Sequence, residues 1–104
     1  MSEWPATSNF FGSLHTSLSR QAVAGLYRSC GWSIRLCGCA DFEIRCAFAE
    51  LLIESNDPVL IHGLVVDVTA NADEIMQPLH RAGVPHTVEL YGANGELLRQ
   101  VKSG

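Results

Sequence analysis

Four cysteines are the residues of this chain whose types and spacing could do chemistry. They fall within one short stretch, at Cys30, Cys37, Cys39 and Cys46. Converging thiolates could bind zinc, and an exposed thiol could act as a redox sensor. The Cys-x-Cys pair is not the Cys-x-x-Cys chelate typical of zinc sites, so the spacing argues against a metal.

The strands around these cysteines decide which way each thiol points. The pattern predicts strands over 32–38 and 42–54, joined by a three-residue loop over 39–41. In this register Gly38 pairs with Phe42, and one face of the hairpin becomes wholly apolar. Such a face is what a sheet packed under helices requires.

The same register sorts the thiols between the two faces. Cys46 points into the core, whereas Cys37 and Cys39 lie on the other face or in the turn, where they are candidate reactive thiols. Arg35 is expected opposite Arg45, which is mildly unfavourable. Thiols on opposite faces of a ribbon cannot converge on one ion, so no metal site is expected.

Glu50 and His62 are the candidate ligand or acid/base residues. His62 lies in an apolar strand expected over 59–68, and Glu50 follows a change of apolar phase between Phe48 and Ala49 that predicts a β-bulge. A core histidine and a solvated glutamate are the alternative interpretations. The chain has no nucleophile elbow, phosphate loop or dinucleotide fingerprint, so no catalytic residue and no cofactor are predicted.

The remaining elements are two helices and a second hairpin. Apolar spacing predicts helices over 18–30 and 72–82, the second capped by Asn71, and an Asn-Gly turn at 94–95 predicts a hairpin over 86–101. The expected fold class is α+β: an antiparallel sheet of about five strands with two helices packed on one face, in the order α-β-β-β-α-β-β.

The N-terminal residues are expected to stand apart from this fold. Residues 1–13 are rich in Ser, Asn and Gly and show no periodicity, which predicts a loose N-terminal arm. Residues 14–104 then form a single α+β domain.

Composition excludes several classes of partner. The net charge is −4, with 7 scattered basic residues, so no patch could neutralise nucleic-acid phosphates. No apolar run is long enough to span a membrane, and the opening residues do not resemble a secretory signal. The expected location is the cytoplasm, where thiols stay reduced.

The candidate binding surface is the sheet face opposite the core. In the predicted register this face carries Arg35, Glu43 and Arg45. The third strand is apolar on both sides, and Ile61, together with Leu52 on the neighbouring strand, indicates that the second face is partly covered. These five residues are the candidate binding residues.

The leading hypothesis is a small cytoplasmic, non-enzymatic protein-binding module: an adaptor, an immunity-type inhibitor or an effector chaperone. Only 17% of residues are charged, which favours a homodimer, so the partner is another protein or a second copy. The element order is similar to that of small acidic chaperones of secreted effectors, which usually dimerise, although their final helix is missing here.

Two alternatives stay open. One is a small enzyme or ligand-binding domain with a pocket between sheet and helices, using Glu50 and His62. The other is a thiol-based redox sensor that uses Cys37 or Cys39.

Overall fold

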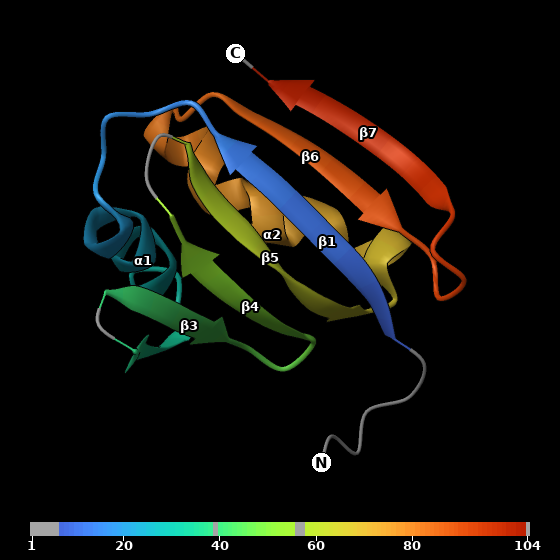
Figure 1. Cartoon of the computed structure of the whole chain (residues 1–104), viewed down its shortest axis with the longest axis horizontal. Coiled ribbons are helices and arrows are strands. Elements are labelled where there is room, and N and C mark those ends of the chain that lie inside the picture. Colours follow the sequence, from blue (N-terminus) through green and yellow to red (C-terminus); the bar gives the residue numbers. More distant parts are fainter. Residues whose placement is uncertain (1–6, 39, 56–57, 104) are drawn as a thin grey trace.

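In the computed structural model, the described residues 7–38, 40–55 and 58–103 form two helices and one seven-stranded antiparallel sheet (Figure 1). In chain order the elements are β1 (Thr7–Leu14), α1 (Arg20–Arg28), β2 (Ser33–Cys37), β3 (Asp41–Arg45), β4 (Ala49–Glu54), β5 (Val59–Val66), α2 (Val68–Ala82), β6 (His86–Tyr91) and β7 (Leu97–Ser103). The α+β class and the antiparallel sheet are confirmed. In the view of Figure 1, α2 lies behind the sheet, and α1 lies to its left, above β3.

The predicted number and order of strands are wrong, chiefly because β1 occupies part of the predicted arm. The strands follow the order β2-β3-β4-β5-β1-β6-β7, so β1 lies between β5 and β6. Its Phe10 and Leu14 side chains are buried in the core. Residues 7–13 therefore belong to the sheet, and residues 1–6 of the predicted arm lie outside the described residues.

The strand predicted over 42–54 is in fact a hairpin of β3 and β4. The Cys46 amide donates to the Ala49 carbonyl at 3.0 Å, which closes the turn between them. The change of apolar phase near Phe48 therefore marks a turn, and the predicted β-bulge is wrong. Within these residues the chain reverses direction where the sequence suggests one bent strand.

The predicted register of the first hairpin is displaced by two residues. Cys37 pairs with Asp41 and Leu36 with Phe42, whereas the prediction pairs Gly38 with Phe42. Because side chains alternate with a period of two, a displacement of two leaves each residue on its predicted face. The displacement does change the neighbours, and Arg35 lies opposite Glu43 instead of Arg45.

Helix α1 begins and ends where local signals favour it. The Ser19 side chain accepts a hydrogen bond from the Ala22 amide at 3.1 Å, a standard N-cap. Beyond the last turn, Gly31 adopts a φ of 93°, which costs glycine little. Val23 and Tyr27 face the core from this helix.

Helix α2 begins four residues before its predicted start. Its first residue is Val68, and Asp67 precedes it in a left-handed conformation without a side-chain cap. The predicted cap, Asn71, instead lies inside the helix, and its side-chain amide donates a hydrogen bond to the Val66 carbonyl at 2.6 Å. The end at Gly83 agrees with the prediction, since Gly83 is left-handed and the Val84 amide donates to Leu79.

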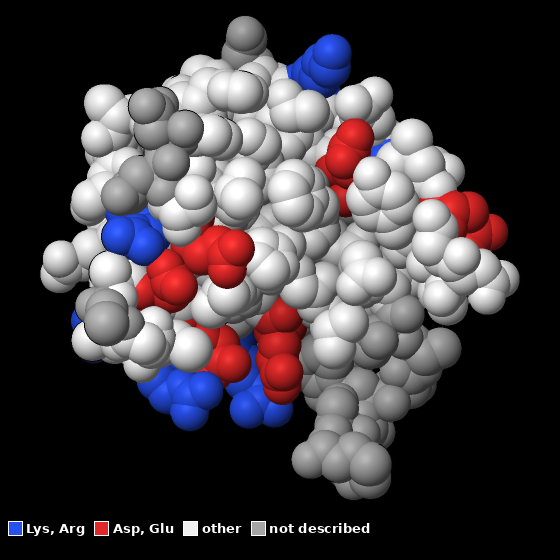
Figure 2. Space-filling view, in the orientation of Figure 1, with Lys and Arg blue, Asp and Glu red and all other residues white. Residues whose placement is uncertain are grey.

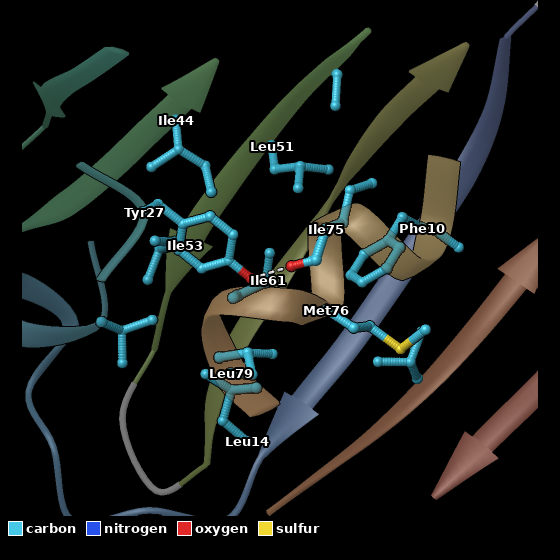
Figure 3. Packing of buried hydrophobic residues seen from close by; sticks show 14 of the residues in the cluster. Phe10, Leu14, Tyr27, Ile44, Leu51, Ile53, Ile61, Ile75, Met76 and Leu79 are labelled. Carbon is cyan, nitrogen blue, oxygen red and sulfur yellow. Dashed lines mark hydrogen bonds between the residues drawn. The ribbon is translucent and has the colours of Figure 1, made fainter. Parts of the chain in front are cut away.

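One hydrophobic core fills the space between the helices and the sheet. Figure 3 shows Tyr27 of α1 reaching across it, and its hydroxyl donates to the Ile75 carbonyl of α2 at 2.8 Å. Burial raises the pKa of this hydroxyl, so it remains a proton donor. The Tyr27 ring also meets Trp32 edge-to-face, with centroids 5.1 Å apart.

We expect Tyr27→Phe to lower the free energy of unfolding by about 1–2 kcal/mol, because it removes the buried hydrogen bond to Ile75 and keeps the ring. Urea denaturation followed by circular dichroism measures this change. Tyr91→Phe is the matched control, since the Tyr91 hydroxyl bonds to Glu89 in a partly exposed position. Equal losses of unfolding free energy for the two variants would show that the hydrogen bond between Tyr27 and Ile75 does not stabilise the fold.

Candidate binding face

The sheet face that neither helix covers is the candidate functional site, and we call it the open face. Strand pairing places one residue from each of six neighbouring strands in a single row across it. From β2 to β6 this row reads Arg35, Glu43, Leu52, His62, Phe11 and Glu89. Figure 2 looks onto this face and shows a broad uncharged area with acidic groups on both sides.

Apolar side chains occupy the middle of the open face. Leu52 and Phe11 flank His62 in the row, and Leu60 and Leu64 lie two residues to either side of His62 on β5. Phe11 is 38% exposed and Leu64 is 39% exposed. We call Phe11, Leu52, Leu60 and Leu64 the apolar patch. An uncovered face of an antiparallel sheet is usually polar, so such a patch marks a contact surface.

Two ion pairs border the patch on the side of β2 and β3. Arg35 Nη2 lies 2.8 Å from Glu43 Oε1, and Arg45 Nη2 lies 2.6 Å from Glu50 Oε2. The predicted contact between Arg35 and Arg45 is therefore wrong, because each arginine faces a glutamate on the next strand. Exposed pairs of this kind stabilise a fold by only about 0–1 kcal/mol, so they matter more for what the face recognises.

Two further carboxylates lie against the patch itself. Glu54 pairs with Leu60 across the strands, and its Oε2 is 3.4 Å from His62 Nε2. Glu89 pairs with Phe11, and its Oε1 accepts a hydrogen bond from the Tyr91 hydroxyl at 2.8 Å, which raises the pKa of Tyr91. Within the described part of the chain, neither carboxylate has a lysine or arginine partner.

The structure brings together most of the residues selected from the sequence. The predicted binding residues Arg35, Glu43, Arg45 and Leu52 lie on the open face. Glu50 lies beside them through its pair with Arg45. Their shared position defines a surface, and their role in binding stays a prediction.

Two residues of β5 lie on the face opposite to the predicted one, because the prediction takes the wrong side of this strand as the core side. Ile61, a predicted binding residue, is completely buried under the helices. His62, expected in the core, has 37% of its side chain exposed on the open face, where its ring stacks on Phe11 with centroids 6.1 Å apart. Since β5 is apolar on both sides, its pattern does not show which side is the core.

The pocket expected between sheet and helices cannot use the predicted residues. Glu50 and His62 point to the side of the sheet that the helices leave uncovered. The helix side has its own shallow groove, lined in part by Cys30, Trp32 and Arg81, and neither Glu50 nor His62 reaches it. The face they share is therefore a surface and not an enclosed site.

The three described cysteines lie at separate places in the fold. Cys46 is half-buried in the turn between β3 and β4, and burial raises the pKa of its thiol. Cys30 is exposed after α1, Cys37 is half-buried in β2, and Cys39 lies outside the described residues. In the described ranges, no three or more His, Cys, Asp or Glu residues are arranged to hold a metal ion.

Sequence reasoning misses several residues of the open face. It places Phe11 in the N-terminal arm and does not select Glu89 from the hairpin predicted over 86–101. It also selects none of Glu54, Leu60 and Leu64, which belong to the strands predicted over 42–54 and 59–68. The alternation around Phe10 and Phe11 is the available signal, since one of two adjacent large aromatics in a strand must point away from the core.

The chain was compared with known proteins in three ways. No protein-family model, curated protein or solved structure matches it. Among the described residues, neither helix has the length and apolar character needed to cross a membrane. Function is therefore inferred from the open face alone.

Proposed function

We propose that the chain is a small, non-enzymatic protein-binding module that docks a partner protein on its open face. The observation that carries this proposal is the apolar patch, which lies in the middle of a sheet face that neither described helix covers. Protein interfaces combine an apolar centre with a polar rim in this way. Arg35, Glu43, Arg45 and Glu50 supply one side of the rim.

The size of the face supports this proposal. The molecule measures 33 × 30 × 22 Å, and Figure 1 looks down its shortest axis. Extents of 33 × 30 Å across the view give a face of about the same size as the roughly 800 Å² per partner that a stable complex buries. Adaptors, immunity-type inhibitors and effector chaperones would all use such a surface, and the proposal covers all three.

The expected cytoplasmic location and homodimer remain proposals of their own, separate from the occupant of the open face. Cys30, Cys37 and Cys46 are free thiols, which suits a reducing compartment. The observed element order, with β1 before α1, differs from the order that resembles effector chaperones, so that resemblance adds no support. A native mass spectrum of the untagged protein checks the dimer.

We expect Leu64→Lys to abolish partner binding without unfolding the chain, because it places a charge in the middle of the apolar patch. Wild-type and variant proteins are immobilised and exposed to lysate of the source cells. A retained protein is identified, purified and titrated against each variant by calorimetry. Its affinity for Leu64→Lys should fall at least about tenfold.

Leu18→Lys is the matched control for this experiment. Leu18 and Leu64 are equally exposed at 39%, but Leu18 lies in the loop before α1 and not on the sheet. The control should bind the purified partner like the wild type. A partner that binds the Leu64→Lys variant as tightly as the wild type would show that the open face is not the binding surface.

A further inference from the structure

The carboxylates of the open face divide into two kinds. Glu43 and Glu50 are neutralised by Arg35 and Arg45 at 2.8 and 2.6 Å. Among the described residues, Glu54 has His62 as its ionic neighbour, and Glu89 has the Tyr91 hydroxyl as its hydrogen-bond partner. All four lie beside the apolar patch, since Glu43 pairs with Leu52 and Glu50 pairs with Leu64 across the strands. Glu54 and Glu89 are the two that no described lysine or arginine neutralises.

These two carboxylates lie on opposite sides of the patch. Glu54 is on β4 and Glu89 is on β6, with β5 and β1 between them. Three strand spacings of about 4.8 Å, combined with an offset of two residues of about 3.3 Å along the strands, place the two residues roughly 16 Å apart. Large apolar side chains, Phe11 and Leu60, are the cross-strand neighbours of Glu89 and Glu54. The arrangement is therefore an apolar centre with a negative charge on each side.

We propose that the occupant of the open face is a basic protein surface, in which apolar side chains lie between two Lys or Arg residues about 16 Å apart. This inference rests on the proposed function and names the chemistry of its partner. Burying Glu54 or Glu89 without a cation would cost free energy, because a carboxylate removed from water needs a compensating charge or hydrogen bonds. A basic partner supplies that charge at both positions.

The negative charges of the open face also argue against a second copy, nucleic acid or anionic lipid as its occupant. A second copy docked face to face would bring the four open-face glutamates of each chain into one interface, and each chain already carries a net charge of −4. Arg35 and Arg45 are already paired with Glu43 and Glu50. The other cation that strand pairing places on this face of the described sheet, Lys102 of β7, could compensate only one of Glu54 and Glu89. Nucleic acid and anionic lipid would place phosphates against the same carboxylates, so neither suits this face.

Two synthetic peptides test the inference before any natural partner is identified. Acetyl-KLWLK-amide has an apolar centre between two lysines, which lie about 13 Å apart in an extended chain. Acetyl-ELWLE-amide has the same centre between two glutamates. Each is titrated into the 15N-labelled full chain, and amide chemical shifts report the position and affinity of binding.

The lysine peptide should shift amides of β4, β5, β1 and β6 and bind at least about tenfold more tightly than the glutamate peptide. The double variant Glu54→Gln/Glu89→Gln should remove most of this preference, and high salt should weaken it. The control variant Asp73→Asn/Glu74→Gln removes the same formal charge from α2 and should leave the preference intact.

Each other outcome overturns the inference in a distinguishable way. If both peptides shift the open face equally, the face binds apolar chains without regard to charge, and only the proposed function stands. If neither peptide shifts it, or if the shifts lie on the helices, both proposals fail. If the free chain is a dimer through the open face, as Leu64→Lys would reveal by producing monomers, the occupant is a second copy.

Discussion

Gly63→Ala is expected to lower the free energy of unfolding by about 3–5 kcal/mol, a large part of the roughly 5–15 kcal/mol that stabilises a small domain. Gly63 lies in the middle of β5, directly opposite Leu51 of β4. A Cβ atom at this position would collide with the Glu50 carbonyl oxygen and would lie 2.9 Å from the Leu51 Cα. Both atoms belong to the backbone, so no side-chain rotation can relieve the contact.

The neighbouring strands explain why the sheet cannot adjust. Strand β4 is paired with β3 on its other side, and β5 is paired with β1 along its whole length. Moving β4 away from Gly63 would therefore break hydrogen bonds on both sides of the collision. Overpacking of a closely packed interior is destabilising for this reason.

Gly12→Ala is the matched control, since Gly12 lies in the adjacent strand β1 and also faces the core. Its Cβ would meet a Phe10 ring carbon at 3.3 Å and a Val88 methyl at 3.5 Å, contacts that side chains can relieve. We expect this variant to lose no more than about 1 kcal/mol. Urea denaturation of both variants gives the comparison, and equal midpoints would show that β4 and β5 do not approach as closely as described.

The α+β class is predictable from the sequence because its local signals are strong. Apolar spacing in α1, the glycine after α2 and the Asn-Gly turn before β7 all determine their elements without help from the rest of the chain. In contrast, β1 combines Ser, Asn and Gly with two phenylalanines and has no clear periodicity. It is a strand because β5 and β6 pair with it from both sides, and such tertiary context overrides weak local propensity.

The part of the open face on β2 and β3 is predictable from the sequence, because successive side chains of a strand alternate between the two faces of the sheet. The predicted first hairpin is displaced by two residues, and a displacement of two preserves faces, so Arg35, Glu43 and Arg45 are correctly grouped. Strand β5 is apolar on both sides, so its sequence does not show which side faces the core. A wrong choice moves every residue of the strand to the opposite face. Ile61 and His62 are therefore both misplaced by one wrong choice.

Ile61→Ala and Leu64→Ala together test the assignment of faces on β5, because the two residues lie on the same strand and on opposite faces. Ile61 is completely buried under the helices, so its truncation leaves a cavity and should lower the free energy of unfolding by about 2–5 kcal/mol. Leu64 is 39% exposed on the open face, and its truncation should cost less than about 1 kcal/mol. Urea denaturation measures both values.

The two variants should also separate stability from binding. Leu64→Ala keeps the fold but removes part of the apolar patch, so it should weaken binding of the partner or the lysine peptide more than it weakens folding. Ile61→Ala should show the reverse wherever it remains folded, because the Ile61 side chain does not reach the open face. If Leu64→Ala instead destabilises the chain as much as Ile61→Ala, β5 is covered on both sides within one chain, and no free apolar surface is left to bind a partner.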